Sequence, residues 1–226
     1  MALSWTTMSS TNATVVPTSL RANGACREEA IEGVDHTAVI DIPPADSLET
    51  RVVHMLEHLV AMNPAGDWGY FLDGARPRWS SIVISGISHG ASSAGVVGMI
   101  RSVSRVVMLS GPLDSNQAWL RGVPLTPIDR FYGFTHTADD QHAGHLAAFE
   151  AMGLLGTPVD VDTVAAPYVG SHRLKSSLPT SDGHGSTQAG GLRRRIAGCT
   201  GSSRCGALAA RRSELLRFAE DLRIRR

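Results

Sequence analysis

The segment "IVISGISHGASSAGVVG", residues 82–98, joins an apolar run to a bend rich in glycine and serine. The apolar run predicts a buried strand, and the small residues after the bend predict a helix that can pack closely on a sheet. Between the two, residues 86–90 read GISHG and match the pattern G-x-S-x-G. At a strand-to-helix turn this pattern is typical of a serine whose hydroxyl projects above the sheet, beside the free amides of a helix start.

Expected strands and helices alternate on both sides of this segment. A helix is expected within residues 45–62, with Asp46 and Glu49 as its capped start, after a stretch at 38–42 that is either a short strand or an extended approach. Further strands are expected at 105–111, 130–136 and 157–162, with a helix at 145–155 and a loop at 66–79. This alternation predicts an α/β fold with right-handed crossovers and a mostly parallel sheet.

The size and charge of the chain set limits on its class. With 226 residues and 42% apolar content, the chain suits one ordinary domain with a sizeable core. The formal net charge is zero, so no global attraction to nucleic acid or to anionic membranes is expected. Three cysteines are too few for a disulfide framework, and no apolar run reaches the length of roughly 20 residues that a membrane helix needs.

A serine nucleophile needs a base, and the base needs an orienting acid. In this type of fold the acid and the histidine follow the serine in that order, from loops at the same edge of the sheet. The loop after 130–136 offers Asp139 and Asp140, and the loops after 157–162 offer His172 and His184. We therefore expect a triad of Ser88, Asp139 and His184, with Asp140 and His172 as alternates.

The oxyanion that forms when Ser88 attacks a carbonyl also needs hydrogen-bond donors. The backbone amide of His89 comes first among the expected donors, because it directly follows the serine at the helix start. The side chain of His89 is expected to line the pocket. Trp68, Phe71 and Trp79 suit either the core or a pocket wall, and the core is the preferred interpretation.

Several stretches together resemble the α/β-hydrolase superfamily, and within it a bacterial esterase-like branch. They are "DSLETRVVHMLEHLVAMNPAGDWGYFL", "ISGISHGASSAG", "RVVMLSGPLD", "RFYGFTHTADDQH", "PVDVD…PYVGSHRL" and "HGST", which together span roughly residues 1–187. The resemblance implies a three-layer fold and hydrolysis of a carboxylic ester or related acyl substrate, with no metal and no organic cofactor. The expected partner is a small-molecule ester, with no nucleic acid and no membrane.

The chain departs from this branch at both ends. Members have additional strands before a segment like "ALSW", so the leading strands and one oxyanion donor are expected to be missing here. After residue 187 the sequence becomes rich in arginine, and residues 191–226 hold ten of the 21 basic residues but three acids. We hypothesise a partial hydrolase-like domain at 1–187 and an appended tail at 188–226, from a truncated and frameshifted gene. Reading the DNA in the other frame after codon 187 tests this hypothesis.

Other functions remain open on sequence grounds. An inactive hydrolase-like protein is the main alternative, because missing leading strands weaken the sheet and the oxyanion hole together. A metal site within the histidine-rich stretch from His136 to His145, which includes Asp139, Asp140 and His142, is a further alternative. Arginine clustering in the tail also permits nucleic-acid binding, but nearly no aromatic residues accompany it. The first residues lack a secretory signal, which predicts a cytoplasmic chain as it stands, although the resemblance implies export.

Overall fold

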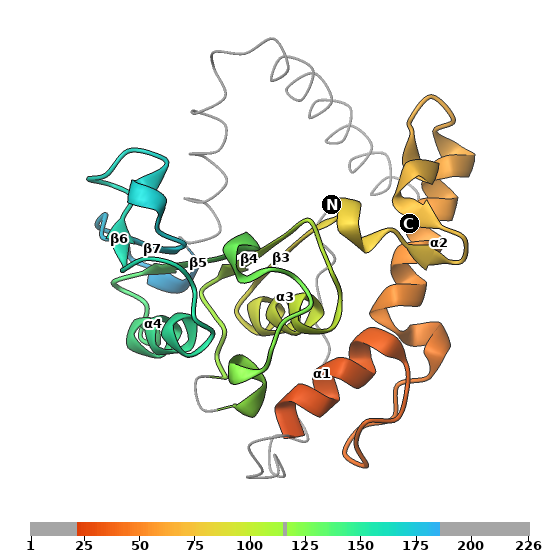
Figure 1. Ribbon diagram of the computed structural model, residues 1–226, viewed down its shortest axis with the longest axis horizontal. Coiled ribbons are helices and arrows are strands. Elements are labelled where there is room, and N and C mark those ends of the chain that lie inside the picture. Colours follow the sequence, from red (N-terminus) through yellow and green to blue (C-terminus); the bar gives the residue numbers. More distant parts are fainter. Residues whose placement is uncertain (1–21, 115–116, 186–226) are drawn as a thin grey trace. The chain divides into compact units, whose positions relative to one another are not determined.

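The computed structural model describes residues 22–114 and 117–185 (Figure 1). Its helices are α1 (Ala22–Glu32), α2 (Leu48–Met62), α3 (His89–Ile100) and α4 (His142–Ala151). Its strands are β1 (Leu72–Asp73), β2 (Arg76–Pro77), β3 (Val83–Ile87), β4 (Arg105–Leu109), β5 (Phe131–His136), β6 (Val159–Asp160) and β7 (Arg173–Ser176). Short 3-10 helices lie at Pro44–Asp46, Trp68–Phe71, Trp79–Ser81, Ala118–Arg121, Ile128–Arg130 and Tyr168–Gly170. The expected tail at 188–226 lies outside the described residues.

A five-stranded sheet forms the centre of the fold. Its strand order is β3-β4-β5-β7-β6, and every neighbouring pair in it is parallel. The strands β1 and β2 form a separate antiparallel hairpin. The predicted α/β class with a parallel sheet is therefore confirmed. Because the main strands all run the same way, the loops that follow them meet at one edge of the sheet.

Strand β7 was not predicted, and the expected strand at 157–162 shrinks to the two residues of β6. Strand β7 inserts between β5 and β6 and pairs with both. The stretch at 38–42, for which a strand or an extended approach was expected, forms no strand. The order of the sheet therefore depends on a short segment that carries two cationic side chains, Arg173 and Lys175.

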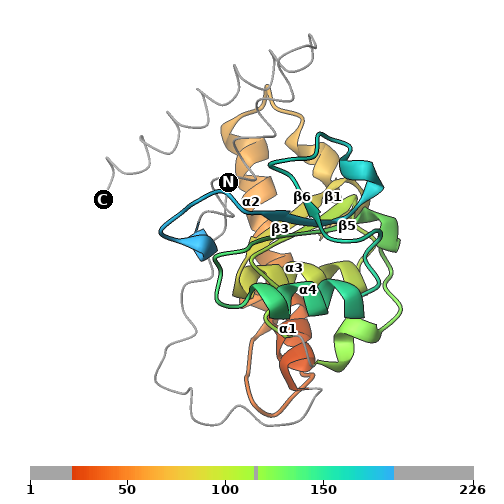
Figure 2. The same cartoon turned by 90° about the vertical axis from the view of Figure 1, so that its left-hand side faces the viewer.

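Helices α1, α3 and α4 lie on one face of the sheet (Figure 2), and α2 lies beyond the β3 edge (Figure 1). Among the described residues, the helices that flank the sheet thus occupy one of its two faces. The three layers that the resemblance implies are not all visible in this part of the chain. None of the described helices has the length and apolar character needed to span a membrane.

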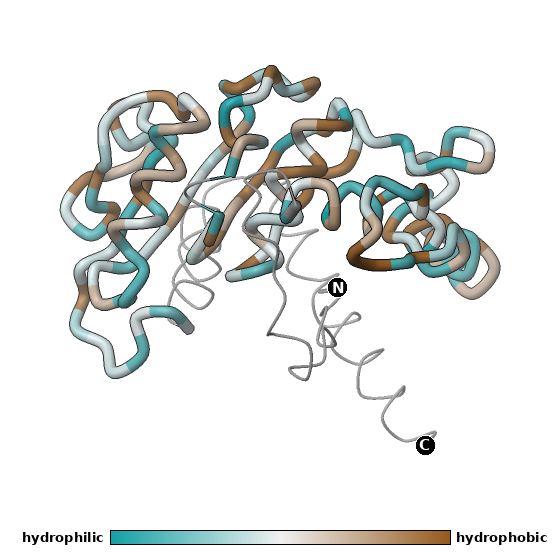
Figure 3. The backbone as a smooth tube through the Cα atoms, turned by 90° about the horizontal axis from the view of Figure 1, so that it is seen from below, coloured by the Kyte–Doolittle hydropathy of each residue, from teal (hydrophilic) through white to brown (hydrophobic). Residues whose placement is uncertain are grey.

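The core lies between α3, α4 and the middle strands. Val97 on α3, Val106 and Met108 on β4, Phe131 on β5 and Phe149 on α4 are all fully buried. Small residues let α3 approach the sheet closely, since a Cβ at Gly98 would lie 2.5 Å from Val106 Cγ2 and 2.6 Å from Phe131 Cζ. Hydrophobic stretches accordingly run through the middle of the fold (Figure 3). This close contact packs α3 against β4 and β5.

The segment before β3 closes one end of this core. Helix α2 buries Leu48, Val52 and Leu56, which repeat at helical spacing. Its N-cap is Ser47, whose Oγ accepts a hydrogen bond from Thr50 N at 3.2 Å, so the predicted start with Asp46 as cap was wrong by one residue. Ser47 satisfies an amide of the first turn, as a cap requires. The side chains of the predicted core residues Trp68, Phe71 and Trp79 are partly buried and pack against the core.

Candidate active site

Ser88 lies at the sharp turn between β3 and α3. Its backbone has φ 57° and ψ −123°, a conformation that residues other than glycine rarely adopt. Its N–H donates a hydrogen bond of 2.9 Å to the carbonyl oxygen of Leu109, at the end of β4. The side chain is partly exposed and does not cap α3, although Ser88 is its N-cap residue. The turn thus presents the hydroxyl at the carboxyl edge of the sheet.

The two glycines of the motif play different parts in this turn. A Cβ at Gly86 would lie 2.0 Å from the carbonyl oxygen of Gly90, so position 86 admits only glycine without movement of the backbone. A Cβ at Gly90 would meet no atom within 4 Å. The turn therefore requires glycine at position 86 on steric grounds, whereas position 90 has room for a side chain.

Asp139 and His184 form a close pair at this edge. His184 Nδ1 lies 2.8 Å from Asp139 Oδ2, and Asp139 Oδ1 accepts a hydrogen bond of 2.9 Å from the backbone N–H of Gln141. The carboxyl side chain is 2% exposed, whereas the imidazole is 41% exposed. Asp139 is therefore fixed inside the fold, and His184 lies between that carboxylate and solvent.

Backbone packing explains the glycine before His184. A Cβ at Gly183 would lie 2.3 Å from the carbonyl carbon of Ala138 and 2.4 Å from the backbone nitrogen of Asp139. The loop that carries His184 therefore touches the main chain of the loop that carries Asp139. The hydrogen bond between the two side chains depends on this close approach.

The Asp139 carboxyl stays ionised at neutral pH. Burial acts to raise its pKa, but the hydrogen bonds from Gln141 and His184, together with the neighbouring His145, lower the pKa below its ordinary value. A buried carboxylate of this kind holds an imidazole in one orientation and stabilises the charge that the ring gains when it takes a proton.

The end of β4 connects this pair to the serine turn. Ser88 N–H donates to Leu109, and the hydroxyl of the next residue, Ser110, donates a hydrogen bond of 3.2 Å to the carbonyl oxygen of His184. The backbone N–H of Ser110 bonds the carbonyl oxygen of Phe134 on β5. Ser110 was not identified from the sequence. The sequence could have indicated Ser110 through its position at the end of the predicted strand at 105–111, at the edge of the sheet that carries Ser88.

The two alternates have different positions. Asp140 is exposed. His172 directly precedes β7, so it lies at the amino edge of the sheet, where its Nδ1 is 2.9 Å from the carbonyl oxygen of Phe131 and its ring stacks on Tyr132 at 4.0 Å. His184 follows β7 and thus belongs to the carboxyl edge. The structure brings Asp139 and His184 together and places His172 at the opposite edge from Ser88.

His89 occupies the first position of α3. Its backbone N–H has no acceptor within the helix, as for every residue of a first helical turn. Its carbonyl oxygen accepts hydrogen bonds of 3.2 Å from Arg27 Nη1 and from Ser93 Oγ. The side chain is exposed, at the turn where a pocket wall was expected. The amide adjacent to Ser88 thus belongs to a helix start that α1 holds in place.

The histidines of the expected metal stretch are engaged in hydrogen bonds. His136 Nδ1 accepts from the N–H of Ala138 at 3.0 Å, and its Nε2 lies 2.9 Å from the carbonyl oxygen of Leu178. His142 and His145 both contact the hydroxyl of Thr135. Within residues 22–114 and 117–185, no group of three or more side chains has the arrangement of a metal site.

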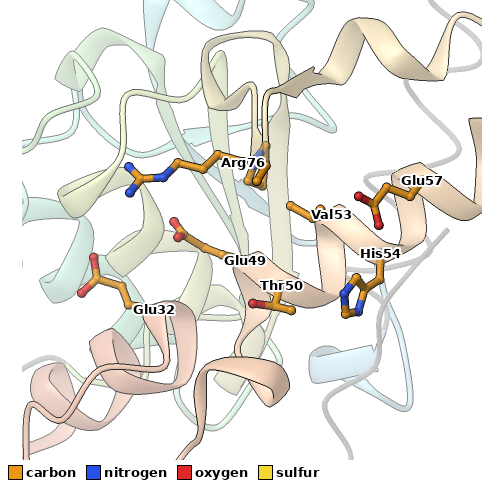
Figure 4. Close-up of a pocket in the computed structure, with 9 residues that line it drawn as sticks. Glu32, Glu49, Thr50, Val53, His54, Glu57 and Arg76 are labelled. Carbon is orange, nitrogen blue, oxygen red and sulfur yellow. The ribbon is translucent and has the colours of Figure 1, made fainter.

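A cavity of about 330 Å³ lies away from this edge, between α1, α2 and the β1–β2 hairpin (Figure 4). Its lining includes Glu32, Glu49, Glu57 and Arg76, and the side chains of Glu32 and Glu49 lie side by side in Figure 4. Arg101 bridges these two carboxylates with contacts of 2.6 Å each. Because Arg101 forms ion pairs with both carboxylates, it links α1 to α2. We therefore assign these two glutamates of the cavity a structural role.

Comparisons of the chain with protein-family models, with curated proteins and with solved structures found no match.

Proposed function

We propose that this protein is a serine hydrolase that cleaves a carboxylic ester or a related acyl substrate through Ser88, His184 and Asp139. The observation that carries the proposal is the pair of Asp139 and His184, joined at 2.8 Å, at the sheet edge where Ser88 occupies a strained turn. A strained residue at a strand-to-helix turn favours a functional interpretation, because such strain is concentrated at active sites.

The chemistry follows from the hydrogen bonds of the imidazole. Asp139 engages His184 Nδ1, which assigns proton transfer to Nε2. In the first step His184 takes the Ser88 proton while Oγ attacks the carbonyl carbon, and the developing oxyanion is stabilised by the amide of His89. The imidazolium then protonates the leaving alcohol. A water, deprotonated by His184, releases the acid and restores Ser88.

The fold supports an α/β-hydrolase-like interpretation at a coarser level. A parallel sheet with the serine turn after one strand, the acid after β5 and the histidine after β7 follows the chain order of that superfamily. Fold alone does not specify chemistry, so the proposal depends on the three side chains rather than on the architecture.

Labelling with a fluorophosphonate probe tests the nucleophile. We expect the wild type to be labelled in a single site and Ser88→Ala to be unlabelled. Ser85→Ala is the matched control, because Ser85 is an exposed serine on β3 and its loss removes the same hydroxyl group. A folded wild-type protein that the probe leaves unmodified overturns the proposal and favours an inactive hydrolase-like protein. A Ser88→Ala protein that is still labelled overturns the assignment of Ser88 as the nucleophile.

Hydrolysis of short aryl esters tests the reaction itself. The purified protein should release the phenol from acetyl to hexanoyl esters, and His184→Ala should lower kcat/KM by at least about a hundredfold. His172→Ala is the control for the histidine assignment, since His172 lies at the other edge of the sheet and its loss should leave kcat/KM within about threefold.

A further inference from the structure

A second layer of polar side chains lies beneath Asp139. Thr135 on β5 and His145 on α4 are both 0% exposed, and His145 Nδ1 lies 2.9 Å from Thr135 Oγ1. His145 Nδ1 also lies 4.0 Å from Asp139 Oδ2, the same oxygen that His184 contacts. The proposed mechanism gives no role to this pair. Burying two polar side chains in a core is costly unless their hydrogen bonds are made.

The hydroxyl of Thr135 restricts where the protons lie. Thr135 Oγ1 is within hydrogen-bonding distance of two ring nitrogens, His145 Nδ1 at 2.9 Å and His142 Nδ1 at 3.3 Å. A hydroxyl has one proton, so it can donate to only one of the two rings. The other ring must donate its own Nδ1 proton to the hydroxyl oxygen if both contacts are hydrogen bonds.

The far nitrogen of His145 decides between the two arrangements. Nε2 of His145 is buried and has no hydrogen-bond partner among the described residues. Burial lowers the pKa of His145 to about 4, so the ring is neutral at pH 7 and carries one proton. A proton on Nε2 would be an orphaned buried donor, whereas a proton on Nδ1 leaves only a lone pair without a partner, which is the smaller defect. The proton therefore belongs on Nδ1.

This assignment fixes the donor and the acceptor of each hydrogen bond among His145, Thr135 and His142. His145 donates its Nδ1 proton to Thr135, and Thr135 donates its own proton to His142, which is partly exposed. The protonated Nδ1 of His145 then lies 4.0 Å from Asp139 Oδ2. The distance of 4.0 Å is too long for a hydrogen bond, so the interaction is electrostatic and leaves Oδ2 available to His184.

We propose that Thr135 and His145 are positioning residues that hold Asp139 ionised and oriented for His184, through a proton fixed on His145 Nδ1. This inference rests on the proposed hydrolase function. Neither residue is expected to touch substrate, so their effect should fall on the rate of the chemical steps and not on substrate binding.

The first test is the protonation of the ring in the wild-type protein. Nitrogen-15 spectra of imidazole-labelled protein at pH 7 distinguish a protonated nitrogen from a bare one. We expect His145 to carry its proton on Nδ1, with the signal assigned from its absence in His145→Asn. A proton on Nε2 overturns the inference, whether or not the protein hydrolyses esters. If His145 carries its proton on Nδ1 but the fluorophosphonate probe does not label the protein, the tautomer assignment stands and the proposed hydrolase function is overturned.

The second test is a comparison of three threonine variants. Thr135→Val removes the hydroxyl at nearly constant volume, and we expect kcat for an aryl ester to fall about tenfold with KM within twofold. Thr135→Ser retains the hydroxyl and should restore kcat to within about threefold of wild type. Thr126→Val is the matched control, because Thr126 is also 0% exposed and its hydroxyl donates to the Arg101 carbonyl, away from the triad.

The outcomes separate positioning from stability. Thr126→Val should lower thermal stability as Thr135→Val does, but it should leave kcat of the folded protein unchanged. Equal kcat in Thr135→Val and wild type, or equal losses in the two valine variants, overturns the positioning role. If Thr135→Val does not fold, Thr135→Ser and the ring spectra still decide the outcome.

Discussion

Arg27 on α1 binds Asp114, in the loop after β4, through hydrogen bonds of 3.0 Å to Oδ2 and 3.3 Å to Oδ1. The same guanidinium reaches the carbonyl oxygen of His89 at 3.2 Å and Ser93 Oγ at 3.1 Å. Arg27 therefore joins three elements that surround the serine turn: α1, the start of α3 and the loop after β4. Trp119 Nε1 adds a hydrogen bond of 3.1 Å to Asp114.

Replacement of Arg27 by Met should destabilise the protein strongly. The side chains of Arg27 and Asp114 are 15% and 5% exposed, so the variant leaves a carboxylate buried without its counter-charge. Breaking a buried pair from one side costs about 3 kcal/mol or more of unfolding free energy. Urea denaturation measures this loss. Fluorophosphonate labelling of Ser88 should slow as well, because the start of α3 loses an anchor.

An exposed ion pair provides the control for Arg27. Asp46 and Arg51 lie 3.4 Å apart with 60% and 54% of their side chains exposed. Asp46→Ala should change the unfolding free energy by about 0.5 kcal/mol or less, because exposed pairs contribute little. Similar small losses in Arg27→Met and Asp46→Ala would show that the bonds to Asp114 do not hold the three elements together.

The two glycines of the serine turn should respond differently to alanine. Gly86→Ala places a Cβ 2.0 Å from the Gly90 carbonyl oxygen, so the backbone must move and the unfolding free energy should fall by about 3 kcal/mol. Gly90→Ala enters open space in the first turn of α3 and should leave stability equal or raise it by about 0.5 kcal/mol. Thermal melts of the two variants measure the contrast. Equal losses in both would mean that the turn has another geometry.

Stability should decline as the pH falls from 6.5 to 4, because of His145. The unfolded chain takes up this proton near its ordinary pKa of 6.5, whereas the folded protein takes it up only at about 4. Below pH 6.5 the unfolded state therefore binds more protons, and the unfolding free energy falls by up to about 3 kcal/mol by pH 4. The lowered pKa of Asp139 adds a further loss only below the ordinary pKa of that carboxyl.

Denaturation curves at pH 7, 5.5 and 4 check the His145 prediction. His145→Asn should be less stable at pH 7 and should lose less stability between pH 6.5 and 4 than the wild type does. Thr126→Val is the control, since its buried hydroxyl does not titrate and its loss should be the same at each pH. An unchanged pH dependence in His145→Asn would mean that other groups cause the decline.

The sheet could be predicted where its strands carry apolar runs. Strands β4 and β5 lie within the predicted segments, and β3 begins within the apolar run that predicted it. The expectation that this first strand is buried was wrong, since none of its five residues is buried and Val83 is 51% exposed. Strand β7 has no such signal: its four residues read RLKS, and it is a strand because it fills the space between β5 and β6. Because β7 was not predicted, the sequence could not decide whether His172 or His184 lies at the same edge of the sheet as Ser88. Only the direction of β7 assigns them to opposite edges.

Helix α1 was absent from the sequence-based interpretation for a related reason. Its residues lack a clear apolar stripe, and tertiary contacts hold it in place. Glu29 on α1 is fully buried, and its carboxylate accepts hydrogen bonds of 3.1 to 3.2 Å from the backbone amides of His36, Thr37 and Ile42. A buried carboxylate satisfied by backbone donors leaves no pattern in the sequence. Ser110 and Thr135 were missed likewise, because their roles arise from neighbours distant in the chain.

Substitution of Ser88 by Gly should distinguish the effect of backbone strain at the turn on stability from the effect of the hydroxyl on labelling. Ser88 has φ 57° and ψ −123°, and such a conformation costs a residue other than glycine about 1–3 kcal/mol. Glycine removes this strain, although it loses more chain entropy on folding, by about 0.5–1 kcal/mol. Alanine keeps the strain. We therefore expect Ser88→Gly to be more stable than Ser88→Ala by about 1 kcal/mol in urea denaturation, with neither variant labelled by the fluorophosphonate. A Ser88→Gly protein no more stable than Ser88→Ala would mean that the turn is relaxed, and the strained nucleophile would lose its structural basis.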